Sequence, residues 1–129
     1  MMTKEEILSY ADSLLGASHD CPFDLDFETT VLRHTASEKW FGVILRAPAA
    51  KVMAGATGEW ELLNLKCAPE DIPILCELYE GICPAYHMNK RHWISVVLSM
   101  SIPDTLLCRL IADSHRLTAR RVDREGEKL

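Results

Sequence analysis

The densest group of chemically versatile side chains lies at residues 86–93, where the sequence reads Tyr-His-Met-Asn-Lys-Arg-His-Trp. Lysine and arginine side chains can pair with phosphate groups, and an asparagine amide can bond to base edges. Histidine and tryptophan rings can stack on bases, and histidine can also transfer protons near neutral pH. The candidate residues for binding nucleic acid or another ligand are therefore His87, Asn89, Lys90, Arg91, His92 and Trp93.

The same residues also have a purely structural interpretation. Asn89 is a natural turn residue, and Lys90 and Arg91 are typical of a solvated turn. Trp93 can begin a strand by burying its ring, and either histidine can hold backbone carbonyls, since buried polar groups must be paired in any fold. The sequence leaves both interpretations, a binding site and a structural corner, open.

The number and spacing of the cysteines indicate the redox environment and whether a metal site is expected. The five cysteines are Cys21, Cys67, Cys76, Cys83 and Cys108. Because the number is odd and no pair has C-x-x-C spacing, we expect no disulfide framework and a reduced, cytoplasmic setting. A zinc site of Cys67, Cys83, His87 and His92 can be drawn, but its spacing matches no familiar pattern. We therefore expect neither a metal nor a cofactor.

Motifs of common enzyme classes are missing from the sequence. It contains no G-x-S-x-G element, no P-loop and no dinucleotide-binding fingerprint. No nucleophile has an evident base partner. The sequence therefore favours a non-enzymatic protein, with a small-ligand-binding or enzymatic domain that uses His87 and His92 as an alternative.

Charge is distributed unevenly along the 129 residues, whose formal net charge is −5. Residues 1–80 carry 6 basic and 14 acidic side chains, whereas residues 81–129 carry 8 basic and 5 acidic ones. A polyanion would therefore have to meet the second part. The acidic start is unlike a signal peptide, and no apolar run approaches the ~20 residues that span a bilayer, so we expect a cytoplasmic protein without a membrane partner.

Three helices are predicted from capping signals and apolar spacing. The first begins with a T-x-x-E capping box at Thr3 and ends at Gly16. The second begins at Pro69, which suits the first helical position, and ends at Gly81. The third begins at Pro103.

Four strands are predicted from runs of β-branched and aromatic residues, at 27–33, 40–45, 60–65 and 93–98. A glycine within the second run, Gly42, indicates a bulge or a close approach. Polar residues 17–26 and 82–91 are predicted as connections, and residues 47–58 are compatible with a long loop or an irregular strand.

The predicted element order is α-β-β-β-α-β-α. The short link between the first two strands favours an antiparallel sheet, and grouped strands flanked by helices are typical of an α+β fold with helices packed on one face. Residues 1–117 then form a single domain, and residues 118–129 form a polar C-terminal tail.

Several segments resemble the MmcQ/YjbR family. His87-Met88-Asn89-Lys90-Arg91-His92-Trp93 is similar to its H-x-N-K-x-H-W signature, and Leu65-Lys66-Cys67 with Pro69-Glu70 is similar to its L-K-x-x-P-E segment. Ile102-Pro103-Asp104 also agrees, as does Asp113-Ser114-His115-Arg116-Leu117, in which His115 replaces the tyrosine of D-S-Y-x-L. Met100 stands near a position where the family often has glycine. The resemblance implies a CyaY-like, frataxin-type fold.

The resemblance also implies a function, DNA binding, which the positive second part and the 87–93 cluster would serve. A frataxin-like metal-binding or protein-interaction role is a further alternative, since carboxylates suit hard cations. The carboxylates concerned are Glu5, Glu6, Asp12, Asp20, Asp24, Asp26 and Glu28.

Overall fold

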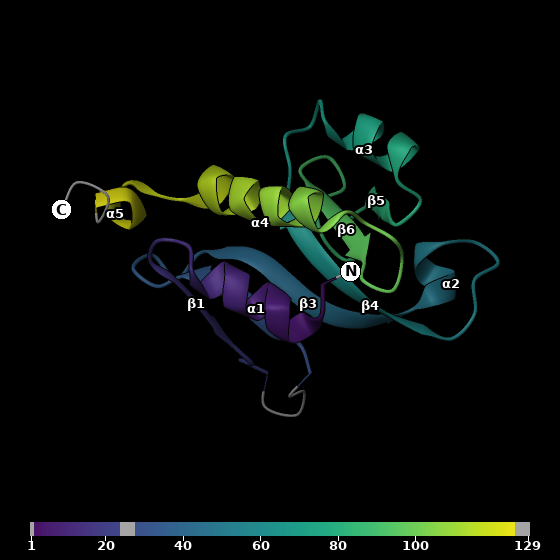
Figure 1. The fold of residues 1–129 in the computed structure, drawn as a ribbon, viewed down its shortest axis with the longest axis horizontal. Helices are drawn as coiled ribbons and strands as arrows, with labels where there is room; N and C mark the ends of the chain where they lie inside the picture. Colours follow the sequence, from purple (N-terminus) through teal and green to yellow (C-terminus); the bar gives the residue numbers. More distant parts are fainter. Residues whose placement is uncertain (1, 24–27, 126–129) are drawn as a thin grey trace.

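A computed structural model describes residues 2–23 and 28–125 of the chain (Figure 1). In this part the helices are α1 (Lys4–Asp12), α2 (Ala49–Val52), α3 (Ile72–Leu78), α4 (Asp104–Thr118) and α5 (Arg121–Arg124). The strands are β1 (Ala17–Asp20), β2 (Thr30–His34), β3 (Trp40–Pro48), β4 (Glu59–Lys66), β5 (Ile82–Pro84) and β6 (Trp93–Val97).

The strands form one sheet in the order β1-β2-β3-β4-β6-β5, and every neighbouring pair is antiparallel. The predicted α+β class with an antiparallel sheet is therefore confirmed. Helices α1 and α4 lie together over one face of the sheet (Figure 1) and contribute Ile7, Leu107 and Ile111 to its main core. We call this the helical face.

The opposite face, which we call the second face, has a smaller apolar cluster. Alternation along the strands directs Leu62 and Val97 to this face, because neighbouring residues of a strand point to opposite sides. They pack with Ala47, with Val52 of α2 and with Tyr86 from the connection between β5 and β6. Both faces of the sheet are thus covered, but only the helical face by long helices.

The predicted order missed two short strands, β1 and β5, and two short helices, α2 and α5. β1 and β5 lie in segments predicted as connections, and β3 continues to Pro48, where α2 begins. The strands at the two edges have only 4 and 3 residues, too few for a periodic pattern, and their conformation depends on pairing with β2 and β6. The start of the predicted 27–33 strand lies outside the described residues.

Helix boundaries also differ from prediction. α1 ends at Asp12, although Gly16 does adopt the left-handed conformation, with φ 65°, just before β1. The capping box at Thr3 is present. α3 spans only Ile72–Leu78, because the chain from Pro69 makes turns first.

The irregularity predicted near Gly42 is present in the pairing of β2 with β3. Leu32 pairs with Gly42 and Arg33 with Trp40, so Phe41 is left without a partner as a bulge. A Cβ atom at Gly42 would lie 2.7 Å from Leu32 Cδ1. The glycine therefore permits close packing where the buried Phe41 ring enters the core.

Candidate functional site

The connection 85–92 between β5 and β6, which contains five of the six predicted contact residues, lies on the second face of the sheet. A buried polar network on the neighbouring strands holds it there. Asn64 of β4 donates from Nδ2 to the carbonyl of Tyr86 at 2.8 Å, and Ser95 of β6 donates from Oγ to Asn64 Oδ1. The Tyr86 amide in turn donates to Ser95 Oγ at 2.9 Å. Because Asn64 and Ser95 are buried, these bonds are shielded from water and fix the start of the loop.

Within the loop, Asn89 and Lys90 bond to the chain itself. Asn89 Oδ1 accepts from the amides of Arg91 and His92 at 2.8 and 3.2 Å, which is a typical asparagine turn. The Lys90 ammonium donates to the carbonyl of Ala85 at 2.6 Å. The Asn89 turn agrees with the structural-corner interpretation, whereas the Lys90 contact differs from the solvated lysine expected there. Together these bonds make the loop an internally bonded turn.

Other side chains of the predicted site remain accessible. Arg91 and His87 are exposed, whereas His92 and Trp93 are half-buried. His87 has a φ of 61°, and its ring centroid lies 3.8 Å from that of Tyr86. Among the described residues, none forms an ion pair with Arg91. The structure therefore places five of the six predicted residues in one turn and the sixth, Trp93, at the start of β6. Asn89 and Lys90 make internal contacts, whereas His87 and Arg91 are exposed.

A cavity of about 240 Å³ lies on the other side of β4, between α3 and α4. Its lining includes Lys66, Cys67, Asp113 and Arg116, which belong to two of the segments singled out in the sequence. The backbone amide of Cys67 donates to the His92 carbonyl at 2.9 Å, so the edge of this cavity touches the end of the 85–92 loop. Three separate motif segments thus meet around the end of β4.

Ser114 fixes the geometry of this junction. The hydroxyl, fully buried, donates to the carbonyl of Phe41 and accepts from the amide of Lys66 at 2.8 Å. It therefore joins α4 to β3 and β4 at the point where β4 ends. The sequence motif around Ser114 does not by itself reveal the cavity, because the residues that line it come from three elements far apart in the chain.

The cysteine in the cavity is unsuited to act as a nucleophile. Burial, together with the nearby carboxylates of Asp71 and Asp113, raises the pKa of the Cys67 thiol to about 11. Since the thiolate is the reactive form, Cys67 is a small apolar wall group near neutral pH.

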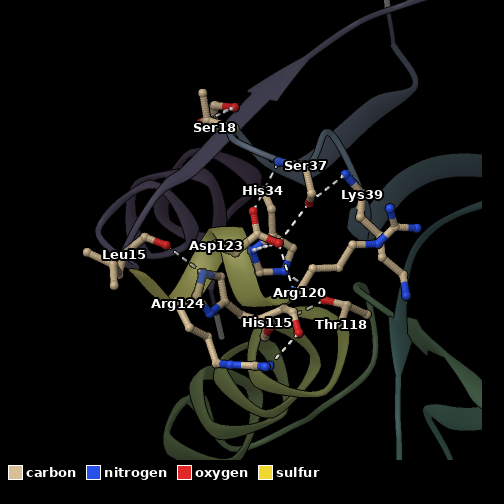
Figure 2. Close-up of polar contacts among 12 residues, drawn as sticks. Leu15, Ser18, His34, Ser37, Lys39, His115, Thr118, Arg120, Asp123 and Arg124 are labelled. Carbon is tan, nitrogen blue, oxygen red and sulfur yellow. Dashed lines mark hydrogen bonds and ion pairs between the residues drawn. The ribbon is translucent and has the colours of Figure 1, made fainter. Parts of the chain in front are cut away.

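A second concentration of polar side chains joins the C-terminal segment to the sheet (Figure 2). The buried His34 of β2 has Nε2 2.9 Å from Thr118 Oγ1. The Thr118 hydroxyl donates to the Ser114 carbonyl at 2.7 Å, so its oxygen accepts and His34 Nε2 carries a proton. Asp123 of α5 accepts from the amide and hydroxyl of Ser37 at 3.1 and 2.7 Å. Its Oδ2 lies 3.9 Å from His34 Nδ1.

The protonation states in this cluster follow from its surroundings. Burial and the neighbouring His115 lower the pKa of His34. Burial alone would raise the pKa of Asp123, but hydrogen bonds from Arg120 and Ser37 outweigh it and lower that pKa. Because His34 is neutral with its proton on Nε2, its Nδ1 donates no hydrogen bond to the ionised Asp123. The hydrogen bonds from Ser37 to Asp123 therefore hold α5, and with it this part of the polar tail, against the connection between β2 and β3.

In the part of the chain that the structure describes, neither predicted set of metal ligands is assembled. Within residues 2–23 and 28–125, no three His, Cys, Asp or Glu side chains are grouped as metal ligands. Asp12 pairs instead with a histidine of β1 at 2.9 Å, and Asp20 with an arginine of β2 at 2.8 Å. Asp24 and Asp26 lie outside the described residues. None of the described helices is long and apolar enough to cross a membrane.

This arrangement defines a small α+β domain in which one sheet face is covered by two helices and the other by a hydrogen-bonded loop. The profile of the YjbR family matches residues 12–117. The chain belongs to the YjbR family, as the sequence resemblance predicted.

Relatives support this assignment over the whole domain. The chain is 39% identical to the uncharacterized protein YyaQ of Bacillus subtilis over 118 residues, which are 92% of this chain and 99% of that protein. A crystal structure from Pseudomonas syringae is similar with a TM-score of 0.83 at 32% identity, covering 92% of this chain and 100% of that chain. The Deinococcus radiodurans protein DR2400, of family DUF419, has a TM-score of 0.76 at 26% identity, covering 100% and 90%.

Proposed function

We propose that this chain is a non-enzymatic binding domain whose 85–92 loop contacts the phosphate backbone of DNA. The observation that carries the proposal is the Arg91 side chain, which is exposed on an internally bonded turn and has no ion-pair partner among the described residues. A guanidinium has the planar geometry that phosphate prefers. Because the turn is already ordered, little conformational freedom is lost on contact.

Neighbouring groups support the same assignment. The ammonium of Lys90, although bonded to the Ala85 carbonyl, adds positive potential beside Arg91. The exposed His87 and the half-buried rings of His92 and Trp93 offer faces on which unpaired bases can stack. The contact is therefore of the phosphate-and-stacking kind, which carries little sequence preference.

The charge of the whole chain limits how strong this binding is. The net charge is −5, whereas residues 81–129 carry 8 basic and 5 acidic side chains. Attraction is therefore local, and we expect weak binding that falls steeply as salt is raised.

Fluorescence anisotropy tests the proposal. The protein is titrated against a random DNA duplex and a single strand, each at low and physiological salt. Arg91→Glu is expected to weaken binding about tenfold at low salt and to reduce the salt slope by about 1, the loss of one phosphate contact. Lys90 is left unchanged, because its bond to Ala85 holds the loop.

The matched control is Arg121→Glu, which makes the same charge change on an α5 side chain that is 89% exposed. This variant is expected to bind DNA like the unmodified protein. Equal losses from the two variants would mean that only net charge matters. That result, or the absence of binding at low salt, would overturn the proposed contact.

A further inference from the structure

The cavity between α3 and α4 is lined by both apolar and charged side chains. Leu75 of α3 and Leu106 and Leu110 of α4 form its walls, together with the thiol of Cys67. α3 packs chiefly against β5, so the space beside α4 is left unfilled. At about 240 Å³, the cavity is many times larger than the roughly 10–15 Å³ that a single water needs on the same measure. Its walls are thus suited to an apolar group of a few carbon atoms.

The charged side chains that line this cavity form an incomplete set of ion pairs. Asp113 and Arg116 pair with each other at 3.6 Å. Lys66 and Arg109 also line the cavity, and neither forms an ion pair within the described residues. Asp71 is the remaining carboxylate of the lining. The unpaired positive charge therefore exceeds the unpaired negative charge by one, which complements a single anionic group.

One apolar side chain of α3 that lines the cavity is also exposed to water. Ile74, which lines the cavity, is 57% exposed. Leaving a large aliphatic side chain in water is unfavourable in proportion to the apolar area exposed. A molecule with an apolar body that lies against Ile74 and Leu75 would remove part of that area from water.

We propose that this cavity binds a small molecule with one carboxylate on a short apolar body. The carboxylate pairs with Lys66 and Arg109, and the apolar body lies between Leu75, Leu106 and Leu110. Arginine suits this role because its fork of N–H donors can bind a carboxylate through two parallel hydrogen bonds. The inference does not depend on DNA binding, because the two sites use different residues.

Octanoate is the test ligand, with its uncharged analogue octanamide and the head group alone, acetate, as comparisons. Uniformly ¹⁵N-labelled protein is titrated with each, and the amide signals of Cys67, Leu75 and Leu110 are followed by NMR. We expect saturable shifts with octanoate at a Kd below about 1 mM, in the range open to so small a ligand. Octanamide and acetate should each bind at least about tenfold more weakly, because one lacks the charge and the other the apolar body.

Two charge variants locate the head group. Arg109→Gln and Lys66→Gln should each bring octanoate affinity close to that of octanamide, whereas Arg121→Gln on α5 should leave it unchanged. All three changes lie at the surface or at its edge, so folding is retained and can be checked in the same spectra. Equal affinity for octanoate and octanamide, unsaturable shifts, or shifts outside the cavity would overturn the proposal.

Discussion

The hydrogen-bond network under the 85–92 loop leads to a sharp prediction for Asn64→Leu. Asn64 is 1% exposed and bonds to the Tyr86 carbonyl and the Ser95 hydroxyl. Leucine has the same number and branching of side-chain heavy atoms, so the substitution removes the polar contacts with little change in side-chain shape. It therefore measures what the network contributes to the free energy of unfolding.

The magnitude follows from the groups left without partners. The substitution deprives the Tyr86 carbonyl of its donor and the Ser95 hydroxyl of its acceptor, and each buried unsatisfied group costs about 1–3 kcal/mol. Ser95 still accepts from the Tyr86 amide, and the leucine gains some apolar burial, so we expect a loss of about 2–3 kcal/mol. For a domain of this size that lowers Tm by roughly 6–15 °C.

Urea denaturation of Asn64→Leu, Ser95→Ala and the double variant is the assay. Because the two side chains share one network, the double variant should lose about 1 kcal/mol less than the sum of the single losses. Hydrogen exchange should also show faster opening of the 85–92 amides. A loss below about 0.5 kcal/mol for Asn64→Leu, or strict additivity, would refute the reasoning that this network fixes the loop.

Three further predictions concern the junction and the C-terminal cluster. Ser114→Ala should lower the free energy of unfolding by about 2 kcal/mol in urea, because two buried backbone groups lose a partner; an unchanged midpoint would contradict this. The pKa values of His34 and Asp123 are both lowered from ordinary values of 6.5 and 3.8. The contribution of these two groups to the free energy of unfolding is therefore complete when the pH lies above those ordinary values. It should be lost as the pH falls, first through the His34 range and then through that of Asp123. His34→Gln should remove the first step from a stability–pH profile, and retention of that step would contradict the assignment. With a pKa of about 11, the Cys67 thiol should react with iodoacetamide at pH 8 far more slowly than the exposed Cys21. Mass spectrometry of the two peptides measures both rates, and faster labelling of Cys67 would contradict this prediction.

Local signals explain which parts of the fold were predictable from the sequence. The capping box at Thr3 and the strands at 40–45, 60–65 and 93–98 depend on neighbouring residues, and all are present. The edge strands β1 and β5 were missed because so few residues carry too little pattern, and pairing with a partner strand decides their conformation.

The candidate site was predictable only in part, for a similar reason. The concentration of polar and aromatic side chains at residues 86–93 was evident from the sequence. The hydrogen bond between Asn64 and Ser95 that holds this loop was not, because it joins residues 31 positions apart. The cavity was not visible because β4, α3 and α4 supply its lining. Sequence motifs marked some of these residues, and only the fold brought them together.

The two short edge strands also determine how this molecule can meet others. A sheet edge with unpaired backbone groups is a template for adding a further strand from another chain. β5 offers only Ile82–Pro84, ends in a proline that lacks an N–H donor, and is packed against α3. β1 is only four residues long and carries the charged Asp20. Addition of a strand from another chain is therefore disfavoured at both edges of the sheet, which favours recognition through side chains.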